Sequence, residues 1–176
     1  DVASVLLENG ADPYITDNAK NDPFIVSCMF GRIENLRFWL KQFPKWDLNR
    51  RNIMGGTALG MTVYIGPKKL EIAKYLISQG ARDDIISYNG TSVLMCVCMN
   101  EDADLNVVKL LLSRNAPINL RIRPRTKMWR AIYLFSTLSF RSGVNKSILM
   151  QSLAERQGRT ALHYAVRRGD LQLVEI

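Results

Sequence analysis

His163 is the only histidine in this chain of 176 residues, and a lone imidazole could act as a general base near neutral pH. Three cysteines, Cys28, Cys96 and Cys98, could bind a metal, but their spacing to His163 is not that of a Cys/His zinc site. The sequence has no nucleophile elbow, no paired-carboxylate site and no His-Glu-x-x-His motif. We therefore predict a protein that is not an enzyme, without catalytic residues, metal or cofactor, in which the thiols are buried.

A glycine-rich stretch from Gly55 to Gly60 matches the first part of a phosphate-binding loop. Met61 follows where such a loop needs its lysine, so the contact with the β- and γ-phosphates is missing. We expect this stretch to be a turn followed by a helix start, without a nucleotide.

The net charge of +8 comes from one part of the chain. Nine lysines and arginines lie between residues 119 and 159 against the single acid Glu155, whereas basic and acidic residues balance in the rest. Within this part, the segment 121–127 alternates arginine with Ile122 and Pro124. Because proline does not fit a helix interior, we expect an extended loop here.

This basic segment supplies most of the candidate binding residues. An arginine guanidinium can form paired hydrogen bonds with a carboxylate or a phosphate. We expect the segment to bind another protein that carries an acidic or phosphorylated segment, and we expect no small-molecule substrate. The candidates are Arg121, Arg123, Arg125, Lys127 and Arg130, together with Tyr88. The alternatives are a solvated charged loop and electrostatic attachment of residues 121–130 to nucleic acid or to an anionic membrane.

The elements that position these residues are short helices that recur along the chain. In the stretch from Gly158 to Ala165, Thr160 can cap the start of a helix, and Gly169 can end it. Leu162, an apolar residue of this stretch, has counterparts earlier in the chain at Phe24, Leu59 and Leu94. The steps along this series are 35, 35 and 68 residues. A helix pair of this size cannot bury its apolar faces alone, so it must stack on its copies.

The stretch Gly-x-Thr-Ala-Leu-His-x-Ala, residues 158–165, resembles the Thr-Pro-Leu-His motif of ankyrin repeats, and residues 169–176 resemble the second helix of such a repeat. The resemblance implies an all-α solenoid of stacked helix-turn-helix units with β-hairpin loops, in which His163 helps to hydrogen-bond the helix start. One ankyrin-repeat domain would cover residues 1–176, as a fragment of a longer ankyrin-repeat protein. Its parts would be a partial repeat at 1–17, repeats at 18–51, 52–85 and 86–121, and a partial repeat at 158–176.

Residues 122–157 lack the repeat signature but have two apolar stretches with helical spacing, separated by Ser142-Gly143. We favour an atypical repeat that stacks in line with the others, and the hairpin after it is expected to be missing or shortened. The alternative is a helical insertion that projects sideways. The first of the two stretches, Met128 to Phe140, is basic and amphipathic, a pattern also found in calmodulin targets and in helices on membrane surfaces.

The resemblance also implies the function of a non-catalytic protein-interaction scaffold, which binds its partner through the hairpin fingers and the concave helix face. A regulatory part of a larger enzyme is a further alternative. The apolar run from Ala131 to Phe135 is far shorter than the ~20 residues of a membrane span, so no transmembrane helix is expected. With unpaired cysteines, the expected location is the cytoplasm or the nucleus.

Overall fold

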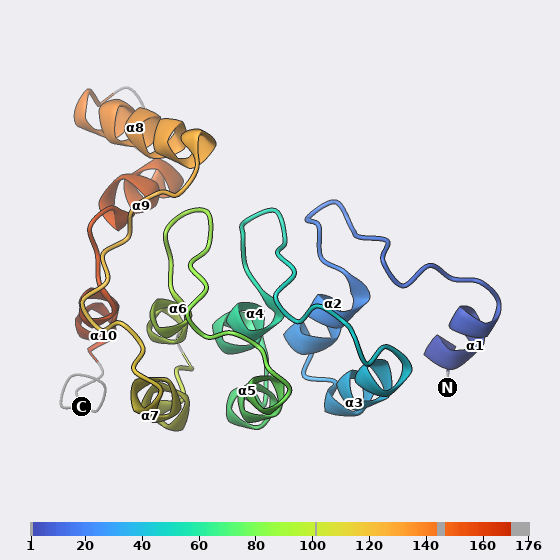
Figure 1. Ribbon diagram of the computed structural model, residues 1–176. Coiled ribbons are helices and arrows are strands. Elements are labelled where there is room, and N and C mark those ends of the chain that lie inside the picture. Colours follow the sequence, from blue (N-terminus) through green and yellow to red (C-terminus); the bar gives the residue numbers. More distant parts are fainter. Residues whose placement is uncertain (1, 101, 144–146, 170–176) are drawn as a thin grey trace.

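The computed structural model describes residues 2–100, 102–143 and 147–169, and its helices form two parallel rows (Figure 1). The first row consists of α2 (Pro23–Met29), α4 (Ala58–Ile65), α6 (Val93–Met99) and α10 (Ala161–Arg168). The second row consists of α3 (Ile33–Gln42), α5 (Lys69–Ser78) and α7 (Leu105–Ser113). The helix α1 (Val2–Glu8) precedes them, and α8 (Lys127–Arg141) and α9 (Ile148–Arg156) stand outside both rows.

Polar side chains fix where the helices of the first row begin. The cap accepts a hydrogen bond from a backbone N–H three residues on, at 2.8 Å for Asp22, 3.3 Å for Thr57 and 3.2 Å for Ser92. In α10, Thr160 N donates to Nδ1 of His163 at 3.3 Å, and the two side chains lie 2.9 Å apart. His163 therefore serves the helix start, as the resemblance implies.

Apolar side chains form one continuous core through the stack. Within the first row, α2 packs against α4, α4 against α6, and α6 against α10. Phe24, Leu59 and Leu94 are buried in these contacts, at most 3% exposed. Leu162, the fourth member of the series, differs, because 51% of it is exposed. Leu162 lies on α10, and the main described neighbour of α10 is α6. The exposed leucine is on a side of α10 that α6 does not cover.

The loops before α2, α4 and α6 have the shape of hairpins, although the described residues contain no β-strand. Backbone bonds close each of these loops, for example Asn52 N to Gly56 O and Ser87 N to Thr91 O, both at 3.0 Å. Further backbone bonds join neighbouring loops, from Ile53 N to Ala19 O at 2.8 Å and from Tyr88 N to Met54 O at 3.0 Å. We call these three loops the loop row. All of them rise from the same side of the stack (Figure 1).

The helices α8 and α9 pack against each other and form an insertion within the loop between α7 and α10. Ile122 N donates to Arg159 O at 2.9 Å, and Gly158 N donates to Ile122 O at 3.0 Å, so the chain leaves and re-enters the stack at one point. Figure 1 shows α8 and α9 rising above the first row, while α10 continues that row beside α6.

The in-line stacking favoured from the sequence is therefore wrong, and the alternative of a projecting insertion describes the structure. Residues 123–157 are about as long as one repeat. An in-line repeat and a projecting insertion therefore give the same spacing between Leu94 and Leu162, and the sequence spacing cannot distinguish them. The expected loss of the following hairpin is confirmed, because only residues 157–160 connect α9 to α10. The loop before α10 is interrupted between Ile122 and Gly158 and closes again around the insertion.

None of the helices in the described ranges is long and apolar enough to cross a membrane. The longest of them, α8, has 15 residues and ends in Arg141.

Candidate functional site

The basic segment runs alongside the last loop of the loop row. Arg125 N donates to Tyr88 O at 2.8 Å, and the backbone of Arg123 lies against Gly90. The buried side chain of Ile122, 1% exposed, anchors the segment to the stack, whereas Arg121, Arg123 and Arg125 are exposed. The backbone of the segment is thus held in place while its cationic side chains face the solvent.

Tyr88 lies in the same loop and is half-buried. The guanidinium carbon of Arg51 lies 5.5 Å from the centre of its ring, a cation–π distance. Arg51 and Arg125 line a shallow pocket of about 490 Å³ together with Arg82, which forms an ion pair with Asp84 at 2.7 Å. Tyr88 and Arg125 were predicted as binding residues, and the structure brings them together. Arg51 and Arg82 were missed, because nothing in their local sequence separates them from any other surface arginine.

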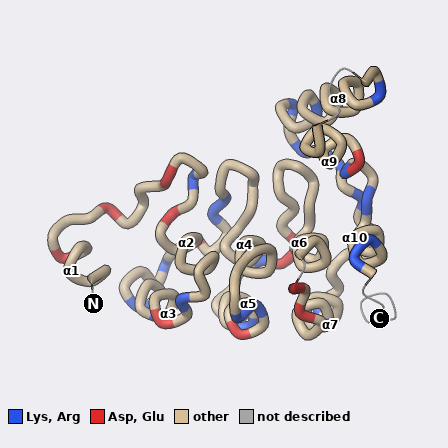
Figure 2. The backbone as a smooth tube through the Cα atoms, turned by 180° about the vertical axis from the view of Figure 1, so that it is seen from behind, with Lys and Arg blue, Asp and Glu red and all other residues tan. Residues whose placement is uncertain are grey.

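Lys127 and Arg130 are exposed at the start of α8, beyond the loop row. Thr126 caps this helix by accepting from Trp129 N at 3.3 Å. Figure 2 shows lysine and arginine spread along the insertion and α10, with acidic residues mainly in the earlier repeats. The five predicted cations thus follow one path from the stack into the insertion, and neither Lys127 nor Arg130 lines the pocket beside Tyr88.

The aromatic side chains of α8 divide between two faces. Tyr133 is fully buried, its ring centre lies 5.7 Å from that of Trp129, and its hydroxyl donates to Asn89 O at 3.3 Å. Burial raises the pKa of Tyr133 to about 12. Phe135 is exposed and lines an apolar groove of about 350 Å³ between α8 and α9. The contacts of Tyr133 attach the insertion to the same loop that the basic segment follows.

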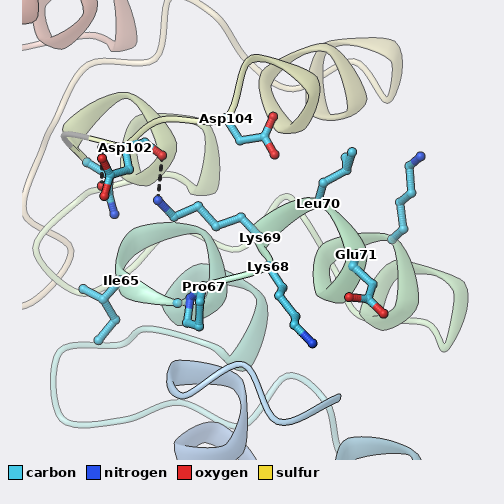
Figure 3. A pocket seen from close by; sticks show the side chains of 11 residues that line it. Ile65, Pro67, Lys68, Lys69, Leu70, Glu71, Asp102 and Asp104 are labelled. Atoms are coloured by element: carbon cyan, nitrogen blue, oxygen red, sulfur yellow. Dashed lines mark hydrogen bonds between the residues drawn. The ribbon is translucent and has the colours of Figure 1, made fainter. Parts of the chain in front are cut away.

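A further pocket of about 720 Å³ lies at the turns before α5 and α7, away from the loop row (Figure 3). Lys69 reaches to Asp102, where its Nζ donates to the backbone carbonyl at 2.7 Å, while Lys68 points the other way. Burial lowers the pKa of Lys69, and the nearby Asp102 and Asp104 oppose this. Because side chains of both signs line the pocket, it has no marked preference for an anion or a cation.

Within the described residues the cysteines form no disulfide, with Cys28 and Cys98 buried and Cys96 half-buried. Burial raises the pKa of Cys28 to about 12, so its reactive thiolate is scarce at neutral pH. Across the described ranges, no group of three or more His, Cys, Asp and Glu side chains is arranged to hold a metal ion.

Comparison with known proteins agrees with this architecture. The model of a family described as ankyrin repeats in three copies matches residues 25–122 and 65–176. The chain is 30% identical over 98 residues to the ankyrin repeat and SAM domain-containing protein 6 of Rattus norvegicus. It is 29% identical over 97 residues to the protein of the same name from Mus musculus. Each alignment covers 55% of this chain and 11% of the relative's length.

Ankyrin repeats are in general modules that bind other proteins, and the family is generally non-catalytic. The stacked helix pairs, the capped first helices and the family match together show that this chain belongs to the ankyrin repeat family.

Proposed function

We propose that this chain is a non-catalytic scaffold that binds a partner protein along the loop row and the basic segment. The observation that carries the proposal is the series of backbone bonds that joins the three loops to each other and the last loop to Arg125. These bonds hold a continuous edge in a fixed shape, so little ordering is needed when a partner binds. The helix face beside this edge, which the family resemblance predicts to be concave, would complete the binding surface.

The partner segment at this edge is acidic or phosphorylated. Arg121, Arg123 and Arg125 are exposed, and no side-chain ion pair involves them within the described residues. Arg51 adds positive charge beside Arg125, whereas the charge of Arg82 is balanced by Asp84. Exposed arginines can give a carboxylate or phosphate paired hydrogen bonds without first breaking a bond within the chain. The three cysteines, which form no disulfide within the described residues, fit a location in the cytoplasm or the nucleus, where thiols stay reduced.

The proposal is tested by charge reversal of the basic segment. A variant with Arg121, Arg123 and Arg125 all changed to Glu should lose the partner that the unaltered chain captures from a cell lysate, as identified by mass spectrometry. The matched control reverses three exposed lysines on the second row of helices, Lys41, Lys74 and Lys109. The control should keep the partner. Equal capture by both variants would show that the segment is only a solvated loop.

Nucleic acid or an anionic membrane is the competing ligand of the basic segment. The binding constant for a phosphate backbone would fall steeply with salt. On duplex DNA, the slope of log K against log salt concentration is about −0.9 for each phosphate neutralised. If capture depends on added nucleic acid, or if the chain binds anionic vesicles and the triple variant does not, the segment serves attachment instead of partner binding.

A further inference from the structure

A second positively charged site lies where the insertion returns to the stack. A pocket of about 550 Å³ opens there between α9, α10 and the ends of α4 and α6. Four arginines line it: Arg156 from α9, Arg159 from the turn that follows, and Arg167 and Arg168 from α10. Tyr64 and Tyr164 are also in its wall, and none of the described residues that line it is acidic. We call it the arginine pocket.

Two of the four arginines already have partners in the chain. Arg159 forms an ion pair with Glu155 at 2.8 Å, and Arg168 donates to the backbone carbonyl of Asn100. Within the described residues, the side chains of Arg156 and Arg167 form no hydrogen bond and no ion pair. Arg156 is nevertheless half-buried. A partly buried guanidinium without a counter-charge is costly, and an anion in the pocket would remove that cost.

The hydroxyl of Tyr164 is the second, independent indication of a ligand. Tyr164 is only 7% exposed, and its hydroxyl is buried without a hydrogen-bond partner. Such an unpaired group destabilises the folded chain, so buried hydroxyls are normally paired. The Arg159 guanidinium lies 5.8 Å from the centre of the tyrosine ring. Burial raises the pKa of Tyr164, while Arg156, Arg159 and Arg167 oppose this, so all three cations act on the same hydroxyl.

We propose that the arginine pocket binds a phosphate monoester, with Arg156 and Arg167 neutralising its charge and the Tyr164 hydroxyl donating a hydrogen bond to a phosphate oxygen. Two guanidinium groups that form no ion pair within the described residues suit a dianion, and their forked N–H donors suit its tetrahedral oxygens. The pocket is larger than a phosphate alone, so the group that carries the phosphate fits inside as well. The aromatic rings of Tyr64 and Tyr164 provide walls for that group.

The phosphate can come from two sources. It is either a phosphorylated side chain of the proposed partner protein or a free small phosphate compound. Only the first source rests on the proposed function, to which it adds a site separate from Arg121, Arg123 and Arg125. The binding of phosphate itself requires no partner and is measured on this chain alone.

The test is a titration of the whole chain at pH 7.5 with inorganic phosphate, O-phosphotyrosine and a phosphotyrosine peptide, followed by calorimetry and ³¹P NMR. We expect saturable binding of one phosphate. Arg156→Gln combined with Arg167→Gln should weaken phosphate binding about tenfold or more, because each charged hydrogen bond contributes substantially to the binding free energy. The matched control is Arg32→Gln with Arg141→Gln, which removes the same charge from exposed positions outside the pocket and the basic segment and should bind as the unaltered chain does.

Tyr164→Phe separates a binding role from a structural one. The substitution removes only an unpartnered hydroxyl, so the melting temperature should stay the same or rise, while phosphate affinity falls several-fold. Non-saturable binding, or equal weakening in the pocket and control variants, would overturn the proposal. Much tighter binding of the peptide than of inorganic phosphate would assign the site to a partner protein, and similar affinities would assign it to a free phosphate compound. Failure of this test leaves the charge-reversal test of the basic segment unaffected.

Discussion

At the scale of single residues, two glycines allow the loop row to be closely packed. Gly55 and Gly90 have φ of +80° and +95°, and the backbone of the next loop or segment lies directly against each of them. A Cβ on Gly55 would lie 2.5 Å from Tyr88 N, and one on Gly90 would lie 2.6 Å from Arg123 N. The position of the basic segment thus depends on the absence of one methyl group.

The first prediction concerns Gly90→Ala. The added methyl group would overlap the Arg123 backbone, so we expect a loss of stability about 1–3 kcal/mol greater than that of a control without the overlap. Gly80→Ala is that control, because Gly80 has a similar φ of +97° and nothing within 4 Å of the added Cβ. Urea unfolding of both variants gives the difference. Equal losses would mean that the close approach to Arg123 contributes nothing beyond backbone strain.

The second prediction uses two equivalent leucines with different surroundings. Leu94→Ala leaves a cavity in the core around α6 and should cost about 2–5 kcal/mol. Leu162→Ala, at a position that is already 51% exposed, should cost much less. Thermal unfolding of the two variants measures the contrast. An unchanged melting temperature for Leu94→Ala would show that the repeat register is wrong.

The third prediction follows from the buried Tyr133. Its pKa is about 12 in the folded protein against 10.0 for an ordinary tyrosine, so above pH 10 the unfolded chain loses the proton first. Stability from this group is therefore complete below pH 10 and falls as the pH rises from there. Tyr133→Phe should be less stable than the unaltered chain at pH 8, where it lacks the bond to Asn89 O. This gap should narrow between pH 9.5 and 11 in unfolding measurements, and a constant gap would contradict the prediction.

At the scale of helices, the regular repeats follow from local rules that the sequence displays. Asp22-Pro23, Thr57 and Ser92 each mark the start of a helix, because a capping side chain and the next few residues decide it. The direction in which the insertion projects does not follow from such local rules. It depends on backbone bonds of Ile122 with Gly158 and Arg159, and backbone groups are the same in every sequence.

The two proposed binding sites differ in how far the sequence predicts them. The cluster of positive charge around Arg121 to Arg125 is visible in the sequence, because its members are neighbours in the chain. The arginine pocket is not, because Tyr64, Arg156 and Tyr164 come together only when α10 stacks on α6 and the insertion folds back. A prediction of in-line stacking would place these residues in different parts of the molecule.

The fourth prediction tests the insertion as a separate element. Replacing residues 123–157 by a short Gly-Ser linker should leave α10 packed on α6, because Ile122 and Arg159 are already bonded to each other. The circular dichroism of the variant should lose the helical signal of α8 and α9 alone. Amide hydrogen exchange in α10 should remain slow. Loss of that protection would show that the insertion holds α10 in place.

At the scale of the whole molecule, stability should vary along the stack. In a solenoid each unit is stabilised mainly by its neighbours, and α4 and α6 have a packed helix of the first row on both sides. The helix α1 has no buried residue. The fifth prediction is therefore a gradient in amide hydrogen exchange, slowest in α4 and α6 and fastest in α1. Uniform protection across all helices would contradict nearest-neighbour stabilisation.

The closed base of the insertion also has a consequence for the order of folding. Before α10 can dock on α6, the unfolded chain between them must bring its ends together, and residues 123–157 make that chain about twice as long as in the other repeats. Doubling a flexible loop costs only about 0.6 kcal/mol of closure entropy. If α8 and α9 pair first, the two ends already lie side by side and most of that cost is removed. The helical hairpin can then act as a local nucleus that delivers the last described helix to the stack.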